Sequence, residues 1–263
     1  MPGRPHPILL LGAGRMGGAL VRGWLGAGAF AAEDIYVRDP VPSPESLKAG
    51  HINPPDAVLA NVQTVVLSVK PQVWKVVAAE IAPLLSVDAV IVSIAAGVSL
   101  SALEEAFAPR KVARVMPTTA VAIGKGVASI FSTDSVARAA AHALFDPVAV
   151  SVDLTHEGLM DAATAVSGSA PAYLYAFIEA LELAGAEAGL EPGDAQKLAR
   201  QTIFSAAALM GESGEAPAEL RRQVTSPGGT TEAALKVLMG EGGFPDLLQA
   251  AVNAAVVRAG ELG

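Results

Sequence analysis

The chain has 263 residues, of which 52% are hydrophobic and 17% are charged, and this composition excludes a disordered chain. Its formal net charge of −8 disfavours nucleic acids and anionic membrane surfaces as partners. The absence of cysteine excludes disulfides, a thiolate nucleophile and a cysteine-ligated metal, and is typical of a cytoplasmic protein. We see no signal-peptide pattern in the proline-broken residues 1–7 and no apolar run long enough to span a membrane.

Strand-like and helix-like segments alternate through residues 1–153. Continuous apolar runs predict buried strands over residues 8–11, 35–38, 64–69, 89–94 and 112–116. Two weaker strands are predicted over residues 128–131 and 148–152. Helical spacing of apolar residues predicts helices between the strands, over residues 16–27, 72–85 and 99–107. Ser99 is the expected N-cap of the last of these helices. The alternation predicts a Rossmann-like α/β domain: a parallel sheet covered on both faces, with ligands outside the carboxyl ends of its strands.

From residue 154 to residue 263 the pattern contains no convincing strand. Helical segments separated by Pro and Gly are predicted over residues 160–189, 194–211, 219–224, 230–239 and 245–262. The sequence therefore predicts a dinucleotide-binding domain over residues 1–153 and an all-α domain over residues 154–263.

A glycine-rich hexapeptide follows the first strand and opens the first helix: Gly12-Ala13-Gly14-Arg15-Met16-Gly17. Its glycines permit a tight turn and close approach of a pyrophosphate, which the N–H groups of the helix N-terminus can bind. Such a hexapeptide alone could be an ordinary turn. At the first strand–helix junction of an alternating array, it favours dinucleotide binding.

The end of the second strand normally separates the two nicotinamide cofactors. An acidic residue there binds ribose hydroxyls, whereas a nearby arginine binds a 2′-phosphate. This chain has both, as Arg38 and Asp39, and Arg38 could also be a solvated loop residue. We favour NADPH and keep NADH as the alternative.

Polar residues follow the third and fifth of these predicted strands. Lys70 could contact the nicotinamide ribose or amide, or be exposed to solvent. Pro117-Thr118-Thr119 offers hydroxyls near the expected nicotinamide position, or is an ordinary loop. The four histidines are scattered, no cluster has metal-ligand spacing, and no Ser or Thr has a His nearby, so we expect neither a metal site nor a hydrolase triad.

The most informative stretch joins two helices of the second half: Val224-Thr225-Ser226-Pro227-Gly228-Gly229-Thr230-Thr231-Glu232. Adjacent glycines at a helix start expose backbone N–H groups, and Ser226, Thr230 and Thr231 add hydroxyls. This is a small anion pocket suited to a carboxylate. A simple helix cap is the alternative, although a cap needs only one hydroxyl.

These pieces together resemble the pyrroline-5-carboxylate reductase family over essentially the whole chain. Besides the glycine turn and the Ser226 loop, the matching pieces, in the family's order, are Ser68-Val69-Lys70-Pro71-Gln72, Ser93-Ile94-Ala95-Ala96-Gly97-Val98, Arg114-Val115-Met116-Pro117, Leu159-Met160-Asp161-Ala162, Pro171-Ala172-Tyr173 and Pro217-Ala218-Glu219-Leu220. The resemblance implies an NAD(P)H-dependent reduction of 1-pyrroline-5-carboxylate to L-proline, the last step of proline biosynthesis. It also implies a homodimer with interlocked helices, which in this family often assembles into a decameric ring of five dimers.

The resemblance also implies residue roles. In the family the active site lies between one subunit's cofactor and the partner's Ser-Pro-Gly-Gly loop, so Ser226 and the amides of Gly229 and Thr230 would hold the substrate carboxylate, and Thr231 would act near the imine nitrogen. Expected substrate-binding residues are Pro117, Thr118, Ser226, Gly228, Gly229, Thr230 and Thr231, of which Thr231 is catalytic. Expected cofactor-binding residues are Gly12, Ala13, Gly14, Arg15, Met16, Gly17, Arg38, Asp39, Asn53, Val69, Lys70, Pro71, Ala95 and Gly97.

Some positions depart from the family pattern. Thr118-Thr119-Ala120 replaces Asn-Thr-Pro, Ala170 replaces a glycine, Arg15 replaces an asparagine, and Arg221-Arg222 replaces Lys-Asp. The loss of the amide at position 118 keeps a reductase of another cyclic imine as an alternative. Ala170 matters only if that position needs a positive φ.

Two further classes of protein share the same coarse plan. A β-hydroxyacid dehydrogenase would place a catalytic lysine on the first helix of its second domain, but residues 168–189 contain no lysine. A non-catalytic dinucleotide sensor would have no need of a carboxylate pocket.

The reductase mechanism would be hydride transfer to the imine carbon. The imine would bind already protonated, or it would be protonated through Thr231. The main contribution of the enzyme would then be to position the cofactor and the imine for reaction.

Overall fold

The computed structural model describes residues 6–262 and divides into two compact units. Unit 1 comprises Met1–Gly168 and Ala255–Gly263, and unit 2 comprises Ser169–Ala254. The last strand ends at Asp153, where the sequence places its domain boundary, whereas the contacts separate the units at Gly168. The expected absence of a signal-peptide pattern in residues 1–7 concerns residues mostly outside the described range.

Unit 1 contains an eight-stranded sheet with the order β3-β2-β1-β4-β5-β6-β7-β8. The strands are β1 (Ile8–Leu11), β2 (Ile35–Arg38), β3 (His51–Ile52), β4 (Thr64–Leu67), β5 (Val90–Ser93), β6 (Val112–Pro117), β7 (Gly126–Phe131) and β8 (Ala149–Asp153). The reversal of strand order next to β1 is the feature at which parallel α/β sheets bind ligands.

One prediction about the sheet was wrong: it is not parallel throughout. Strands β1 to β6 pair in parallel, but β7 pairs antiparallel with β6. Only a 3₁₀ turn at Thr119–Ile123 joins these two strands, and a parallel crossover needs a much longer connection. The carboxyl ends of β1, β4, β5 and β6 still share one edge.

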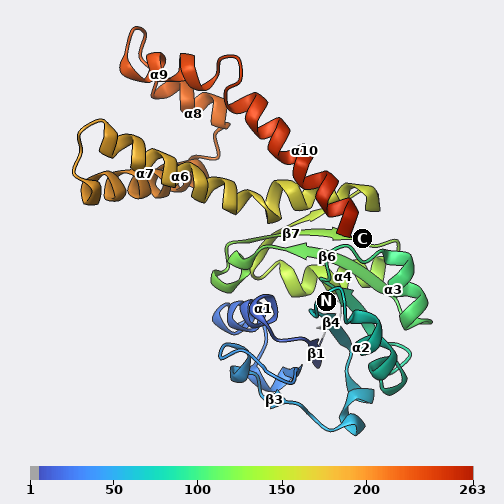
Figure 1. Ribbon diagram of the computed structural model, residues 1–263. Coiled ribbons are helices and arrows are strands. Elements are labelled where there is room, and N and C mark those ends of the chain that lie inside the picture. The colour runs from blue at the N-terminus through green and yellow to red at the C-terminus, as the bar shows by residue number, and fades with distance from the viewer. Residues whose placement is uncertain (1–5, 263) are drawn as a thin grey trace. The chain divides into compact units, whose positions relative to one another are not determined.

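Helices cover both faces of the sheet (Figure 1). They are α1 (Arg15–Gly26), α2 (Trp74–Ile81), α3 (Leu100–Phe107) and α4 (Ser135–Phe145). Alternate residues of β1 face opposite sides: Ile8 and Leu10 pack in the core with α1 and α4, whereas Leu9 and Leu11 pack in the core with α2 and α3. This explains why β1 is apolar at every position.

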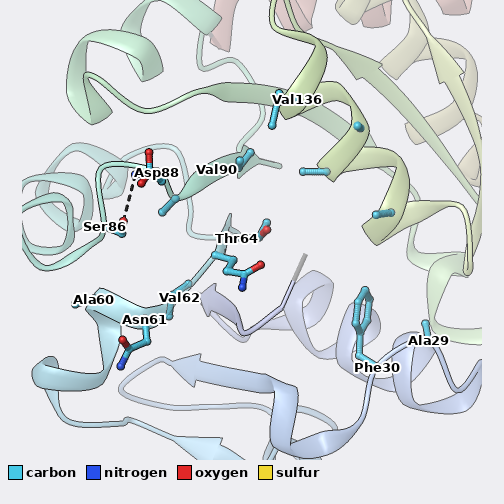
Figure 2. Close-up of a pocket in the computed structure, with 15 residues that line it drawn as sticks. Ala29, Phe30, Ala60, Asn61, Val62, Thr64, Ser86, Asp88, Val90 and Val136 are labelled. Atoms are coloured by element: carbon cyan, nitrogen blue, oxygen red, sulfur yellow. Dashed lines mark hydrogen bonds between the residues drawn. The ribbon is translucent and has the colours of Figure 1, made fainter. Parts of the chain in front are cut away.

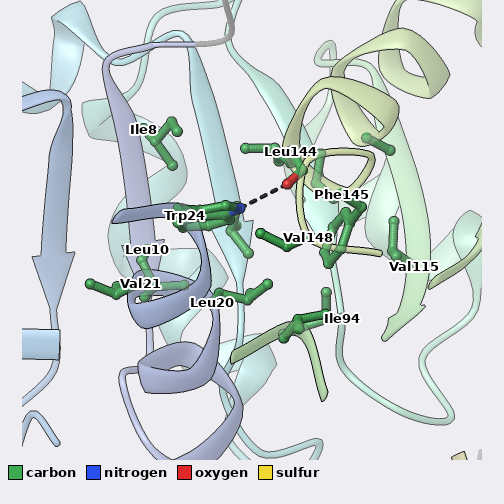
Figure 3. Close-up of a cluster of buried hydrophobic side chains, with 14 of the residues drawn as sticks. Ile8, Leu10, Leu20, Val21, Trp24, Ile94, Val115, Leu144, Phe145 and Val148 are labelled. Carbon is green, nitrogen blue, oxygen red and sulfur yellow. Dashed lines mark hydrogen bonds between the residues drawn. The ribbon is translucent and has the colours of Figure 1, made fainter. Parts of the chain in front are cut away.

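Trp24 is the largest side chain of the core that β1 shares with α1 and α4, and it is fully buried (Figure 3). Its indole Nε1–H donates to the Leu144 carbonyl oxygen at 2.7 Å, which ties α1 to the end of α4. An unsatisfied buried donor would cost about 1–3 kcal/mol. The predicted N-cap of α3 is confirmed, because the Ser99 hydroxyl accepts from the Ala102 N–H at 3.3 Å. Helix α4 and strand β3 were not predicted.

The second half is helical, as predicted. The predicted helix over residues 160–189 is interrupted, since α5 (Met160–Ala163) passes through a π-turn (Thr164–Gly168) before α6 (Ala170–Glu187). The remaining helices are α7 (Pro192–Ser213), α8 (Pro217–Gln223), α9 (Thr230–Leu238) and α10 (Phe244–Leu262). Ala170 begins α6 in helical conformation, so its replacement of glycine causes no backbone strain.

Unit 2 is built on the packing of α6 against α7. A Cβ on Gly185 of α6 would lie 3.2 Å from the Ala195 Cβ of α7, so glycine permits the close approach. Arg200 Nε donates to Glu182 Oε1 at 2.7 Å across the same pair of helices. Most other residues of α6 are apolar, yet none of its residues is buried in the described chain.

Candidate active site

The glycine turn joins β1 to α1 and is fixed by backbone contacts. Gly12 has φ +86°, and a Cβ there would lie 2.7 Å from the carbonyl oxygen of Ser68, the residue that follows the neighbouring strand β4. A Cβ on Gly17 would clash with the Gly12 carbonyl oxygen. Both positions therefore require glycine, as expected for a turn packed tightly between strand and helix.

The start of α1 presents unpaired donors. Among the described residues, the N–H groups of Gly14, Arg15, Met16 and Gly17 have no hydrogen-bond partner, and the first α1 bond runs from the Gly18 N–H to the Gly14 carbonyl oxygen at 2.8 Å. Gly14 is exposed, and nothing lies within 4 Å of where its Cβ would be. The expected turn residues thus lie at an open helix N-terminus, an arrangement that suits an anion.

Asp39 is engaged by the turn itself. Its Oδ2 accepts from the Ala13 N–H at 2.6 Å, and its Oδ1 accepts from the Val41 N–H at 2.7 Å. Asn53, which has φ +47°, braces the same residue: its Oδ1 accepts from the Asp39 N–H and its Nδ2 donates to the Asp39 carbonyl oxygen, each at 3.0 Å. Asp39 and Asn53 therefore shape the turn, a role that needs no ligand.

Arg38 is also paired within the chain. Its guanidinium forms an ion pair with Asp56, which opens the 3₁₀ helix Asp56–Asn61. The Arg38 side chain is 30% exposed and the Asp56 side chain 60% exposed, so the pair lies at the surface.

A pocket of about 810 Å³ gathers these groups beside the carboxyl ends of β1, β2 and β4. It contains part of the predicted cofactor set, namely Gly12, Gly14, Arg38, Asp39, Val69 and Lys70. The Ser68 hydroxyl, which also belongs to a lining residue, is buried without a hydrogen-bond partner. Open helix N–H groups, a tight glycine turn, flanking cations and an unsatisfied hydroxyl fit a bound dinucleotide.

Other expected residues follow the neighbouring strands. Pro71 and Gly97 line a hollow of about 290 Å³. Ala95 and Pro117 are buried beside the ends of β5 and β6. The hydroxyl of Thr118 accepts from the Val127 N–H at 3.0 Å, so this replacement for the family's asparagine also supports the β7 pairing.

A second large pocket, of about 630 Å³, opens at the other end of the sheet, where β4 and β5 begin (Figure 2). Its lining includes Phe30, Asn61 and Asp88 with many alanines, but no Lys, Arg or His. The start of α4 lies at this pocket, but Asp134 Oδ1 already accepts from the Val136 and Ala137 N–H groups. Without a cation or free helix N–H groups the pocket does not suit an anionic dinucleotide, and we do not assign it to the active site.

The Ser226 loop connects α8 to α9 in unit 2. Gly228 has φ +70°, and Gly229 is the N-cap of α9 without any side-chain cap. In the described chain, the hydroxyls of Ser226, Thr230 and Thr231 make no hydrogen bond, and the N–H groups of Thr230 and Thr231 have no partner. A simple capping role for these hydroxyls is therefore not what the structure shows.

One donor of this loop is already occupied. Glu232 Oε2 accepts from the Gly228 N–H at 2.5 Å, while its Oε1 lies 3.3 Å from Lys236 Nζ. Gly228 was expected to contact substrate, but here its N–H binds a carboxylate of the chain itself. The remaining free donors lie at Ser226, Thr230 and Thr231.

Three residues to which the sequence analysis assigned no role also have a place in the site. Ser68 and Asp56 line the 810 Å³ pocket, and Glu232 binds the Gly228 N–H of the Ser226 loop. Ser68 could have been found as a hydroxyl following a buried strand. Asp56 lies 18 residues from Arg38 in the sequence, and no local pattern predicts that pairing.

No group of His, Cys, Asp and Glu side chains within residues 6–262 is arranged to hold a metal ion. In the same range, no helix has the length and apolar character required to cross a membrane.

The fold and the site define a dinucleotide-binding oxidoreductase with a helical second unit. A family profile described as NADP oxidoreductase coenzyme F420-dependent matches residues 7–97, and one described as pyrroline-5-carboxylate reductase dimerisation matches residues 157–262. The chain is 39% identical to pyrroline-5-carboxylate reductase of Pseudomonas aeruginosa, over 97% of this chain and 96% of that protein. The chain belongs to the pyrroline-5-carboxylate reductase family.

Solved structures agree with this assignment. The Coxiella burnetii pyrroline-5-carboxylate reductase has a TM-score of 0.89 and 32% identity, covering 98% of this chain and 99% of that one. The Plasmodium falciparum pyrroline carboxylate reductase, solved with NADP bound, has a TM-score of 0.84 and 28% identity, covering 99% of each chain. The predicted fold class and family are confirmed.

Proposed function

We propose that this protein reduces 1-pyrroline-5-carboxylate to L-proline with NADPH, the final step of proline biosynthesis. The observation that carries the proposal is the Ser226–Thr231 loop, whose hydroxyls and helix N–H groups are free to bind a carboxylate. A carboxylate pocket distinguishes an enzyme of this substrate class from a dinucleotide sensor. The dinucleotide pocket of unit 1 and the NADP-bound relative support the choice of cofactor.

The cofactor supplies a hydride when bound. The open N–H groups of residues 14–17 would hold its pyrophosphate, and Val69, Lys70, Pro71, Ala95 and Gly97, at or beyond the ends of β4 and β5, would contact the remainder. Pro117 and Thr118 would line the substrate side. These assignments rest on the family resemblance together with the shared edge of the strands.

The loop in unit 2 would bind the substrate carboxylate through the Ser226 hydroxyl and the amides of Gly229 and Thr230. Of these amides, that of Thr230 is free, whereas the Gly229 N–H donates to the Ser226 carbonyl oxygen at 3.0 Å. Binding through Gly229 would therefore require this turn to open or to share the donor. Thr231 would place its free hydroxyl near the imine nitrogen.

The reaction adds a hydride to the imine carbon and a proton to the imine nitrogen, which gives the secondary amine of proline. The proton arrives with an already protonated imine, or it passes from water through the Thr231 hydroxyl. Holding two reactants in register supplies most of the acceleration expected of such a site.

The catalytic assignment is tested by Thr231→Ala. Loss of the hydroxyl should lower kcat by more than about tenfold, because proton delivery and imine orientation are lost together. Steady-state kinetics with 1-pyrroline-5-carboxylate measure this, and titration with NADPH should give an unchanged Kd. Turnover equal to that of the wild type would remove Thr231 from the mechanism.

We also propose a homodimer formed by the helical unit, in which α6 and α7 find the apolar partner they lack in one chain. The dimerisation profile over residues 157–262 supports this proposal. Assembly of five such dimers into a decamer and a cytoplasmic location remain predictions, the first from the family resemblance and the second from composition.

A further inference from the structure

Both residues that could decide between NADPH and NADH are engaged inside the chain. The Asp39 carboxylate binds the N–H groups of Ala13 and Val41, and the Arg38 guanidinium binds Asp56. An acid at this strand end normally recognises ribose hydroxyls, and an arginine normally recognises the 2′-phosphate. The preference therefore depends on how easily each residue leaves its present partner.

The two contacts differ in strength. Asp39 accepts from two backbone donors and is further braced by Asn53 through two hydrogen bonds. Release of Asp39 would leave the N–H group of the buried Ala13 unpaired, so Asp39 stays in place. The Arg38–Asp56 pair is a surface contact, and exposed pairs of this kind contribute about 0–1 kcal/mol. Arg38 is thus the group that can turn toward a ligand.

Asp56 and Arg38 line the same pocket as the glycine turn. The lining cations are Arg38 and Lys70, and the lining carboxylates are Asp39, Asp56 and Glu80. A 2′-phosphate bound near Arg38 would meet the charge of Asp56 as well. NADH has no phosphate at that position, so it would not experience this repulsion.

We propose that Asp56 is a specificity-determining residue, which limits the preference for NADPH by neutralising Arg38 and by repelling the 2′-phosphate. The proposal rests on the proposed use of the glycine-turn pocket for the cofactor. It concerns binding of the cofactor alone, and it does not depend on which imine is reduced.

The test is calorimetric titration of the wild type and Asp56→Asn with NADPH and with NADH, without imine substrate. Asparagine keeps the size of the side chain and removes its charge. The Kd for NADPH should fall about threefold to tenfold, whereas the Kd for NADH should change less than about twofold. The gain for NADPH should shrink in about 1 M salt, where the Debye length is about 3 Å.

Two control variants sharpen the experiment. Asp88→Asn makes the same charge change at the opposite end of the sheet, near the start of β5, and it should leave both Kd values unchanged. In an Arg38→Gln background, the NADPH gain from Asp56→Asn should be smaller than in the wild type. An equal gain would show that Asp56 acts independently of Arg38 and would overturn the proposal.

An unchanged or higher Kd for NADPH in Asp56→Asn, or an equal shift for NADH, would also overturn it. If the wild type binds neither cofactor, the proposed function fails together with this inference. If the wild type binds both cofactors and Asp56→Asn has no selective effect, only this inference fails.

Discussion

At the scale of single residues, the site is shaped by internal partners that imitate a ligand. The Asp39 carboxylate occupies the Ala13 N–H of the glycine turn, and the Glu232 carboxylate occupies the Gly228 N–H of the Ser226 loop. In each case an acidic side chain of the chain satisfies a donor that would otherwise be unpaired. The two carboxylates differ in consequence, because only Glu232 lies on a loop that should receive a carboxylate of the substrate.

Glu232→Gln is predicted to improve substrate binding. The glutamine oxygen can still accept from the Gly228 N–H, but the negative charge next to the loop is removed. We expect the KM for 1-pyrroline-5-carboxylate to fall about threefold, a change typical of one exposed charge, with kcat unchanged. The effect should diminish as salt is added.

The matched control for this prediction is Glu241→Gln, an exposed acidic residue in the turn that follows α9. Steady-state kinetics of the three proteins at low and high salt decide the matter. A KM that is unchanged or raised in Glu232→Gln would show that the Glu232 charge does not oppose the substrate.

The sequence predicts residues of this site unequally. The glycine turn could be predicted because a tight turn, close approach of a pyrophosphate and close packing of strand against helix all require glycine within the same six residues. The pairing of Arg38 with Asp56 could not, because it depends on where the β3 region and the 3₁₀ helix at Asp56–Asn61 bring the chain back. The same holds for Asn53, which was expected at the cofactor and is found bracing Asp39.

At the scale of elements, β1 and β2 could be predicted to the residue because apolar runs end at Gly12 and at Asp39-Pro40. Helix α4 was missed because its alanines lie on both its buried and its exposed faces, so its sequence shows no helical spacing of large apolar residues. Weak strands were also expected on both sides of it. The direction of β7 was missed because alternation of side chains does not encode strand direction. The short connection between β6 and β7 was the available signal.

His142 links α4, which the sequence did not predict, to β8, which was predicted as one of the two weaker strands. Its Nδ1 lies 3.0 Å from Asp146 Oδ1 after α4, and its Nε2 lies 3.2 Å from Asp153 Oδ2 at the end of β8. Burial alone would lower the pKa of His142, but hydrogen bonds and charge attraction from Asp146 and Asp153 raise it above 6.5 overall. The protonated imidazole therefore holds α4 to β8 more strongly than the neutral one.

His142→Gln is predicted to destabilise the protein only at low pH. A raised folded-state pKa contributes stability that is fully present below the unfolded value and is lost as pH rises through the folded value. Because the side chain is 31% exposed, the contribution should be only about 0.5 kcal/mol. Thermal unfolding between about pH 5 and about pH 8.5 should show the Tm difference from the wild type shrinking with pH. A Tm difference that does not change with pH would contradict a stabilising role for the protonated His142.

At the scale of the whole molecule, the chain carries a helical unit that does not bury its own apolar surface. Large side chains of α7 stay exposed, among them Phe204 at 72%. Several large apolar side chains exposed on one helix are typical of an interface between proteins. The exposed apolar side chains and the dimerisation profile therefore support the same proposed assembly.

Phe204→Glu is predicted to break the dimer, because a charge buried in an apolar interface costs several kcal/mol. Size-exclusion chromatography with light scattering should give the mass of one chain for this variant and at least twice that mass for the wild type. Val87→Glu, an equal change at a residue 62% exposed on unit 1, is the control and should leave the mass unchanged. A monomeric wild type would contradict the proposed assembly, and a mass of ten chains would support the decamer.

The most direct test of the account is the amount of L-proline formed for each NADPH oxidised when the wild-type protein is supplied with 1-pyrroline-5-carboxylate. We predict one molecule of L-proline for each NADPH, measured by absorbance and by chromatography of the product. Cofactor that binds but is not oxidised, or oxidation that yields no proline, would contradict the account and direct the search toward another cyclic imine.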